Sequence, residues 1–210
     1  MDDAYITEST YLRFEFTPDF VTHPFLIYLD ADMLVLGDIE EPLNSLTNGT
    51  LGAVRDQFNH TIGECPALPG FSEDFSLHDG KPYFNAGALW MEAGLMQKIK
   101  PGVHSVAVRA KKYIKHNDQD ALNLWLLAGA PVTSVSRLYN HFELSRFLEA
   151  SDWVRRVVTD LKPPEEATLL HFVGPMKPWQ PSCPRTAAVR DYQMFQRETS
   201  TLLRQLGIPT

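Results

Sequence analysis

The sequence is poor in cysteine and in positive charge, and it has no long apolar run. Its two cysteines, Cys65 and Cys183, lie far apart, a spacing that fits neither a disulfide framework nor a thiolate metal site. The formal net charge of -7, with 19 Lys and Arg against 26 Asp and Glu, argues against a nucleic-acid partner bound through a general basic field. The uncharged run 121–136 falls short of the roughly 20 apolar residues that a membrane span needs. We therefore expect no nucleic-acid partner, no transmembrane segment and a small functional partner.

The N-terminus lacks the charged and then apolar pattern of a secretory signal, because Met1-Asp2-Asp3 is acidic. With so few cysteines, a reducing cytoplasm is the simplest compartment to expect. The 210 residues, 44% of them hydrophobic, are enough to bury one core. The sequence therefore predicts a single domain over residues 1–210.

Apolar runs alternate with amphipathic segments along the chain, which predicts an α/β fold. Residues 25–29 are all large and apolar or aromatic, typical of a strand buried on both faces in a parallel sheet. Further strands are expected at 51–54, 83–91 and 167–173, and helices from Val103, from Asp118 and over 186–206. The last helix is amphipathic, and its arginines beside acidic residues favour packing on the core over membrane docking.

The segment 57–82 is rich in Gly, Pro, Asp, Glu and His and shows no periodicity. It predicts either a long loop over a ligand site or a poorly ordered surface segment. Because recognition residues concentrate in such loops, an acceptor could be bound there.

Asp30 and Asp32 directly follow the first predicted strand. In open α/β sheets ligands bind beyond the carboxyl ends of strands, and two carboxylates there can hold a divalent cation that neutralises a diphosphate. The alternative is local, because Asp30 could end the strand and Asp32 could cap a turn. Alone, the pair does not decide between the two.

Asn85 precedes Ala86 and Gly87 at the head of the apolar segment 83–91. Small residues let a ligand approach the backbone, and an asparagine amide offers a donor and an acceptor to sugar hydroxyls. A glycine bulge, with the asparagine in the preceding turn, would give the same pattern.

A polar cluster at 117–123, which includes Asp118 and Gln119, opens a predicted helix. Its side chains and the free N–H groups of the first turn could face a substrate. Helix capping explains one or two of these residues but hardly all of them.

The segment 171–179 joins His171, near the end of the last predicted strand, to Gly174 and Lys177 beyond it. A neutral imidazole can ligate a metal, and a lysine beyond a Gly-Pro turn can point its ammonium group at phosphate. A single histidine is more often a core residue, but the three together indicate a diphosphate clamp.

Taken in order, these four segments closely resemble family 8 retaining glycosyltransferases. The matching motifs are Tyr28-Leu29-Asp30-Ala31-Asp32 with Gly37-Asp38-Ile39, Phe84-Asn85-Ala86-Gly87, Asp118-Gln119-Asp120-Ala121-Leu122-Asn123, and His171-Phe172-Val173-Gly174 with Lys177-Pro178-Trp179. Tyr11-Leu12-Arg13 is similar to the arginine-containing segment that precedes the metal-binding strand in this family. The resemblance covers about residues 5–180.

The resemblance implies a GT-A (Rossmann-like) mixed sheet flanked by helices. It also implies transfer of a hexose, of the glucose or galactose class, from a UDP-sugar to an acceptor hydroxyl with retention of configuration. The acceptor would be a glycan, a lipid-linked sugar or a protein.

The resemblance also assigns roles by position. The metal, Mn²⁺ with Mg²⁺ as the alternative, would be held by Asp30, Asp32 and His171. The nucleotide diphosphate would contact Ala31, Asp32, Gly174 and Lys177. The donor sugar would be surrounded by Arg13, Asn85, Ala86, Asp118 and Gln119, with Asp118 and Gln119 as the catalytic candidates. A Gln119 amide is too weak a nucleophile to favour a covalent intermediate.

Members of the family begin with a further βαβ region that holds the uracil and the ribose, and this sequence starts after it. We therefore expect a domain truncated at its N-terminus, or one completed by a missing segment or in an oligomer. The alternative function is an impaired module that binds metal and diphosphate without catalysis. A nucleotide-sugar pyrophosphorylase is disfavoured, because the sequence shows no N-terminal Gly-rich phosphate loop.

Overall fold

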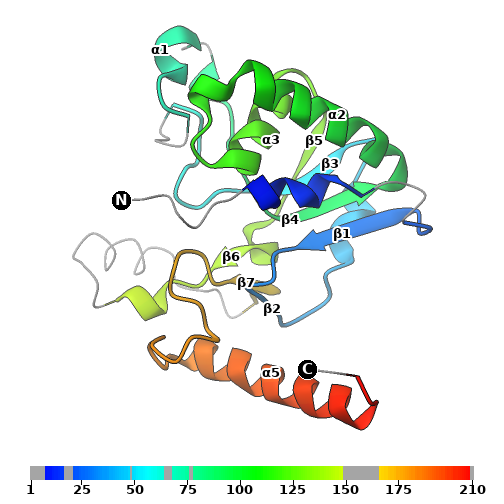
Figure 1. Ribbon diagram of the computed structural model, residues 1–210. Coiled ribbons are helices and arrows are strands. Elements are labelled where there is room, and N and C mark those ends of the chain that lie inside the picture. Colours follow the sequence, from blue (N-terminus) through cyan, green and yellow to red (C-terminus); the bar gives the residue numbers. More distant parts are fainter. Residues whose placement is uncertain are drawn as a thin grey trace.

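The computed structural model describes residues 8–16, 21–47, 49–63, 68–75, 78–148 and 166–208. Its strands form two sheets (Figure 1). The larger sheet has the order β1-β4-β3-β5, with strands Phe25–Leu29 (β1), Phe84–Glu92 (β4), Leu51–Arg55 (β3) and Val132–Val135 (β5). The smaller sheet has the order β2-β7-β6, with strands Met33–Val35 (β2), Leu169–His171 (β7) and His141–Phe142 (β6).

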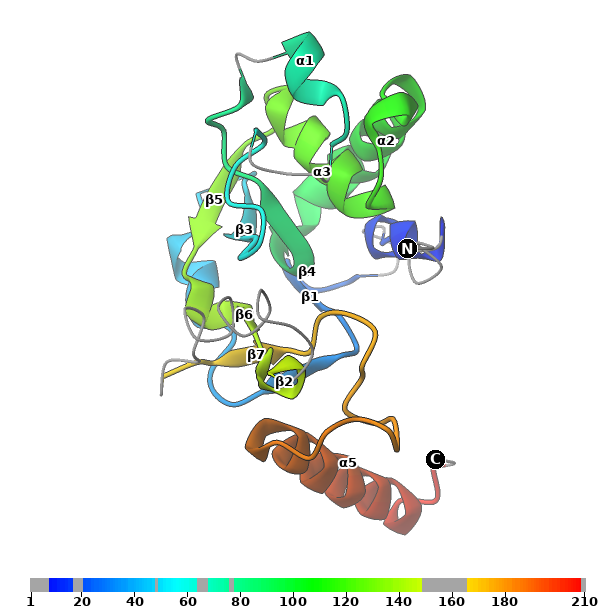
Figure 2. The ribbon, with the colours of Figure 1, turned by 90° about the vertical axis from the view of Figure 1, so that its left-hand side faces the viewer.

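The described α-helices are Phe71–Phe75 (α1), Ala93–Arg109 (α2), Asn117–Leu127 (α3) and Ala187–Gln205 (α5). Short 3-10 helices lie at Glu8–Phe14 (η1), Glu41–Ser45 (η2), Lys111–Tyr113 (η4), Arg137–Tyr139 (η5) and Ser145–Phe147 (η6). Figure 2 shows the larger sheet beside α2 and α3, and the smaller sheet between the larger one and α5. The mixed α/β class expected from the sequence is confirmed.

Strand β4 forms the middle of the larger sheet, and its residues 84–91 are all buried. It pairs antiparallel with β1 and β3, whereas β3 and β5 run parallel. Leu89 and Met91 pack in a cluster with α2 and α3, whereas Ala88 and Trp90 pack with Met33 and Leu169 of the smaller sheet. Because both faces of β4 are covered, its sequence from Ala86 to Met91 has no polar side chain instead of alternating.

Strand β1 lies where residues 25–29 predicted a strand, but the expected parallel pairing was wrong. It runs antiparallel to β4 at one end of the described sheet, and Phe25 is exposed. A run of large apolar residues reports hydrophobicity but not the direction of the partner strand. The partner here is more than 50 residues away in the sequence, so only the folded chain decides it.

Helix α2 begins at Ala93, well before the helix expected from Val103. Pro101 and Gly102 lie inside this helix. Both residues are poor helix formers, so the sequence did not predict the first half of α2. The glycine has a packing role: a Cβ there would lie 2.1 Å from Trp125 Nε1. Gly102 therefore lets α3 approach α2, and both helices bury their apolar sides on the larger sheet.

The segment 57–82 contains structure that its composition did not predict. Helix α1 lies in it, and Ile62, Leu68 and Phe71 form a buried cluster with residues of α2, η4 and α3. Residues 64–67 and 76–77 lie outside the described residues, and Cys65 is among them. The described part of this segment from Ile62 to Phe75 thus packs on the helical layer.

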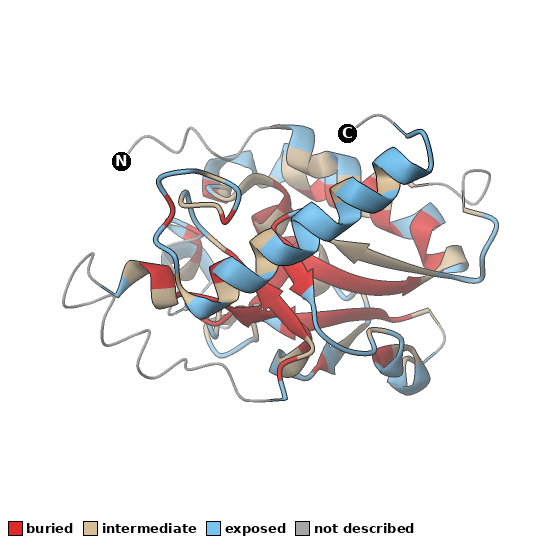
Figure 3. Cartoon of the chain, turned by 90° about the horizontal axis from the view of Figure 1, so that it is seen from below, coloured by how far each residue is buried: buried red, intermediate tan, exposed pale blue. Residues whose placement is uncertain are grey.

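Helix α5 is confirmed as a helix with Thr186 at its N-cap, where the hydroxyl accepts a hydrogen bond from the Val189 N–H at 3.3 Å. Only its beginning packs as expected: Val189 is buried against Leu170 and its neighbours, whereas Leu202 and Leu206 are 55% and 64% exposed. In Figure 3 this helix crosses the front of the molecule and is coloured mostly as exposed. No described helix has the length and apolar content to cross a membrane.

Candidate active site

Asp30 and Asp32 lie in the connection between β1 and β2, where the chain passes from the larger sheet to the smaller one (Figures 1 and 2). Both sheets hold this turn. The Asp30 N–H donates to the Gly87 carbonyl at 2.8 Å, and the Phe172 N–H donates to the Asp32 carbonyl at 2.9 Å. Asp32 is buried, and Ala31 between the two aspartates is exposed. The turn is therefore a fixed element at the junction of the two sheets.

His171 ends β7 and lies opposite Met33 in the antiparallel register with β2, which brings its ring to the turn. Its Nε2 lies 3.3 Å from Asp32 Oδ1 and 3.8 Å from Asp30 Oδ2. One ligand atom from each of the three residues lies within 4.8 Å of the other two. Two carboxylates and one imidazole form a mixed oxygen and nitrogen donor set that fits a divalent cation.

Gly87 of β4 makes room for this cluster. A Cβ at position 87 would lie 2.5 Å from His171 Cε1 and 2.9 Å from Asp30 Oδ2. Real Cβ atoms essentially never come so close to other atoms. The glycine is therefore required by the close approach of the imidazole and carboxylate.

Lys177 reaches the cluster from the segment that follows β7. Its ammonium group donates to Asp32 Oδ2 and to the Phe172 carbonyl, the latter at 3.1 Å. Burial would raise the pKa of Asp32, but the hydrogen bonds and charges of His171 and Lys177 outweigh it and hold the pKa well below its usual range. Asp32 is therefore an ionised carboxylate at neutral pH, and the cation of Lys177 lies beside it.

Arg13 of η1 links Asp30 to Asp118 at the start of α3. Its Nη2 lies 3.1 Å from Asp30 Oδ1, and its Nε lies 2.9 Å from Asp118 Oδ2. Nη1 donates to the Ala86 carbonyl, and the guanidinium carbon lies 4.8 Å from the centre of the Tyr28 ring. Burial raises the pKa of Asp118, and the charge of Arg13 opposes this shift. The arginine thus joins three of the predicted site segments.

The side-chain amides of Asn85 and Gln119 form the next part of the site. Asn85 Nδ2 donates to Gln119 Oε1 at 2.9 Å, and Gln119 Oε1 also accepts from the Ala86 N–H at 3.0 Å. Both amides donate to Asp56 Oδ2, at 3.2 and 3.3 Å. The Gln119 carboxamide is therefore held by its neighbours in one orientation.

The polar cluster 117–123 divides into two groups. Asp118 and Gln119 reach the site through the contacts above. Asp120 instead accepts hydrogen bonds from the N–H groups of Lys115 and His116, both at 2.7 Å, and Asn123 binds the backbone N–H and carbonyl of Phe84. These two residues shape the chain around the helix start.

The described residues thus bring every predicted segment of the site to one place. The model of glycosyl transferase family 8 matches residues 1–183. This chain belongs to that family.

Two curated relatives illustrate the similarity of this family 8 chain to known proteins. The glycosyltransferase GlyE of Streptococcus pneumoniae is 25% identical over 182 residues, which are 83% of this chain and 38% of GlyE. The lipopolysaccharide glucosyltransferase WaaO of Escherichia coli is 27% identical over 180 residues, 82% of this chain and 49% of WaaO. The chain spans less than half the length of either relative.

Solved structures agree with the family assignment. An active-site mutant of LgtC has a TM-score of 0.66 at 25% identity. The match covers 94% of this chain and 70% of the LgtC chain. The galactosyltransferase LgtC in complex with donor and acceptor sugar analogues has a TM-score of 0.62 at 26% identity, with 92% of this chain and 68% of LgtC covered. The expected GT-A fold is confirmed.

The predicted site segments of this family 8 chain are also contacted by residues that none of its motifs marked, among them Asp56, Asn140 and Arg146. Asp56 follows β3, so the rule that singled out Asp30 at a strand end could have found it. Asn140 and Arg146 lie in a stretch where no element was predicted, and nothing in their local sequence marks them. Asn140 Oδ1 lies 2.9 Å from His171 Nδ1.

Arg146 shapes the segment between His171 and Lys177. It is buried, and its guanidinium donates to the carbonyls of Val173 and Met176, the latter at 2.7 Å. Gly174 lies between these carbonyls with φ +84°, a conformation that favours glycine. The buried Arg146 guanidinium thus holds the backbone of the segment that carries Gly174 and leads to Lys177.

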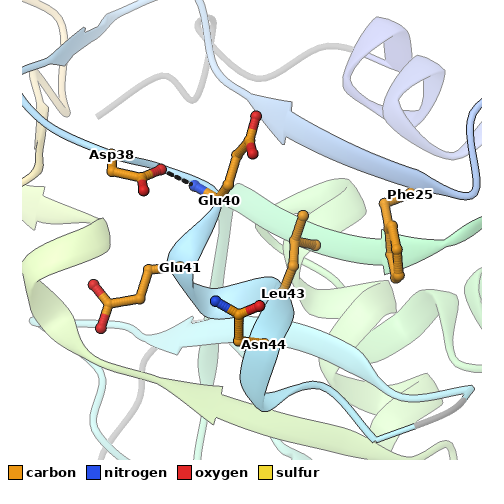
Figure 4. Close-up of a pocket in the computed structure, with 6 residues that line it drawn as sticks. All are labelled: Phe25, Asp38, Glu40, Glu41, Leu43 and Asn44. Atoms are coloured by element: carbon orange, nitrogen blue, oxygen red, sulfur yellow. Dashed lines mark hydrogen bonds between the residues drawn. The ribbon is translucent and has the colours of Figure 1, made fainter.

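An open hollow of about 500 Å³ next to η2 lies apart from these residues (Figure 4). It is lined by Phe25, Asp38, Glu40, Glu41, Leu43 and Asn44. Two of its polar side chains already have partners: Asp38 accepts from the Glu40 N–H at 2.8 Å, and Glu41 accepts from the Tyr139 hydroxyl. None of the predicted site residues contributes to it.

Proposed function

We propose that this chain forms the metal-binding and sugar-binding part of a retaining hexosyltransferase that uses a UDP-sugar and Mn²⁺. The observation that carries the proposal is the convergence of Asp30, Asp32 and His171, whose ligand atoms lie within 4.8 Å of one another. Residues so far apart in the sequence meet only because β2 and β7 pair. Mg²⁺ is the alternative ion, because the two carboxylates would bind either metal. The imidazole ligand favours Mn²⁺ over Mg²⁺.

In this proposal the bound metal supplies Lewis-acid stabilisation of the charge that grows on the departing UDP. The chain itself contributes a second positive charge, because Lys177 lies beside Asp32 and is held there by the Phe172 carbonyl. Preorganised charges of this kind stabilise a transition state without reorganising during the reaction. Ala31, between the two aspartates, and Gly174, in the segment that follows β7, are the proposed backbone contacts to the diphosphate.

The proposed donor-sugar site is formed by Arg13, Asn85, Ala86, Asp118 and Gln119. Gln119 Oε1 is occupied by the Ala86 N–H and by the Asn85 amide, so this carboxamide is held in place as a neutral group. A neutral amide is a poor nucleophile. The arrangement therefore favours stabilisation of the sugar at the reacting face, by Asp118 and Gln119, over a covalent intermediate on Gln119.

The sugar and the acceptor are proposed from the relatives. WaaO is named as a lipopolysaccharide glucosyltransferase, and LgtC is a galactosyltransferase crystallised with an acceptor sugar analogue. We infer that the donor is UDP-glucose or UDP-galactose and that the acceptor is a saccharide. The name of WaaO favours a lipid-linked sugar as this acceptor.

The test is turnover of UDP-glucose and UDP-galactose by the chain with and without Mn²⁺, together with calorimetric titration of Mn²⁺ and of UDP. The key variant is Asp32→Asn, which removes one carboxylate at nearly constant size. Its metal-supported turnover should fall by about 100-fold or more, because loss of a group that merely supports a metal ligand already costs about 10- to 100-fold.

The matched control is Asp191→Asn on the exposed surface of α5, which should leave turnover unchanged. Turnover that does not depend on metal would refute the proposal. Binding of Mn²⁺ and UDP without turnover of either sugar would instead support the alternative, a module that binds metal and diphosphate but does not catalyse.

A further inference from the structure

Asn140 is a fully buried residue between η5 and β6, and it contacts the metal cluster and the sugar site at once. Its Oδ1 lies 2.9 Å from His171 Nδ1, and its Nδ2 donates to Asn85 Oδ1 at 2.8 Å. Its backbone carbonyl accepts from Gln57 Nε2 at 2.6 Å, which fixes the main chain from the end of β3. The side chain is therefore placed with little freedom between His171 and Asn85.

The direction of these hydrogen bonds follows from one backbone group. The Gly87 N–H can only donate, and it donates to Asn85 Oδ1 at 2.9 Å, so that atom of Asn85 is the amide oxygen. The Asn140 atom that meets the same oxygen must then be the NH₂ group. Its other atom, which faces His171, is the carbonyl oxygen and can only accept.

The consequence concerns the tautomer of His171. Because Asn140 Oδ1 only accepts, His171 Nδ1 carries the proton, and in the neutral imidazole Nε2 keeps its lone pair. Nε2 is the atom that lies 3.3 Å from Asp32 and 3.8 Å from Asp30. The Phe142 ring packs against the His171 ring in an edge-to-face arrangement. The two ring centres lie 5.6 Å apart, and the angle between the ring planes is 89°.

We propose that Asn140 is a positioning residue that sets the tautomer and orientation of His171 and joins the metal site to the sugar site through Asn85. The hydrogen-bond chain runs from His171 through Asn140 and Asn85 to Gln119, and every member is a side chain. Groups that bind the second nitrogen of a ligating histidine fix its ring and raise its affinity for metal. The assignment rests on the proposed function, because it takes His171 as a metal ligand.

The experiment compares the wild-type chain with Asn140→Ala, Asn140→Asp and Asn123→Ala. Asn140→Ala removes the acceptor, whereas Asn140→Asp keeps an acceptor for His171 but loses the donor to Asn85. Asn123 is a control for the loss of a buried amide, because it is 1% exposed and its amide binds backbone groups of Phe84 and Gln119. All four proteins are examined without metal by ¹⁵N NMR of the imidazole nitrogens, with His171 identified by His171→Gln, and are then titrated with Mn²⁺ alone by calorimetry.

The wild type and Asn123→Ala should show His171 protonated at Nδ1. Asn140→Ala should shift His171 toward the Nε2-protonated form and weaken Mn²⁺ binding by about 10- to 100-fold. Asn140→Asp should keep the Nδ1 proton and bind Mn²⁺ at least as tightly as the wild type. Such a pattern does not follow from a loss of stability alone.

Two results overturn the proposal: a wild-type His171 whose Nδ1 carries no proton, or an Asn140→Ala variant with unchanged ¹⁵N shifts and unchanged Mn²⁺ affinity. Failure of the proposed function looks different. If the wild type binds no Mn²⁺, the metal assignment fails, and the NMR spectra still decide whether Asn140 sets the tautomer.

Discussion

Gly87→Ala should disrupt the candidate metal site through a single methyl group. The added Cβ would lie 2.5 Å from His171 Cε1, so the imidazole would have to retreat by roughly 1 Å to reach normal van der Waals contact. Asp30 Oδ2 and Asn85 Oδ1, both at 2.9 Å, would be pushed as well. Metal ligands tolerate errors of only about 0.2 Å, and misplacement by about 1 Å in an active site costs about 100-fold.

We therefore expect Mn²⁺ binding to Gly87→Ala to weaken by about 100-fold, about 2.8 kcal/mol in calorimetry. Overpacking should also lower the free energy of unfolding by about 1–3 kcal/mol, measured by urea denaturation. Gly94→Ala is the matched control, because a Cβ there meets no atom within 4 Å and lies in α2, where alanine is the better helix former. Wild-type Mn²⁺ affinity in Gly87→Ala would refute the reasoning.

The remaining predictions concern charge. In the metal-free protein the pKa of Asp32 lies below its usual 3.8, since His171 and Lys177 outweigh the effect of burial. The ionised carboxylate therefore stabilises the fold fully above that pH, and the stabilisation is lost as the pH falls toward the lower folded-state pKa. The difference in unfolding free energy between wild type and Asp32→Asn should shrink from about pH 6 to about pH 2, and a constant difference would contradict the shift. Arg13→Met should lower the free energy of unfolding by about 3–5 kcal/mol, because it leaves the buried Asp118 without its cation. Adding Asp118→Asn should restore part of that loss in thermal or urea unfolding, and a double variant less stable than the single one would argue against the pair.

Much of the fold could be predicted because local patterns were strong. Strands β3 and β4 and helices α3 and α5 lie where apolar runs and periodicity placed them. The short strands β2, β5 and β6 have four residues or fewer, too few to show alternation. The first half of α2 was missed because Pro101 and Gly102 weaken its helical pattern, although the glycine is there for packing against Trp125.

The chemical types of the site residues could be inferred from the Asp30-Ala31-Asp32 turn and from the ordered motifs that follow it. Their supporting residues could not. Asn140 and Arg146 act on His171 and on the segment 173–176 through contacts that span about 30 positions in the sequence. A side chain that acts through such a distant contact leaves no local pattern in the sequence, so its role cannot be predicted from the sequence.

The sequence by itself determined the order of the motifs, the kinds of ligand they offer and the class of the fold, because these depend on residue type and on neighbours within a few positions. Only the tertiary structure decided that the imidazole meets the two carboxylates, since this depends on the register of β2 with β7. It also decided the direction of the amide chain, which begins at the Gly87 N–H and ends at His171 Nδ1. Both depend on distances and orientations between segments, and these exist only once the chain has folded.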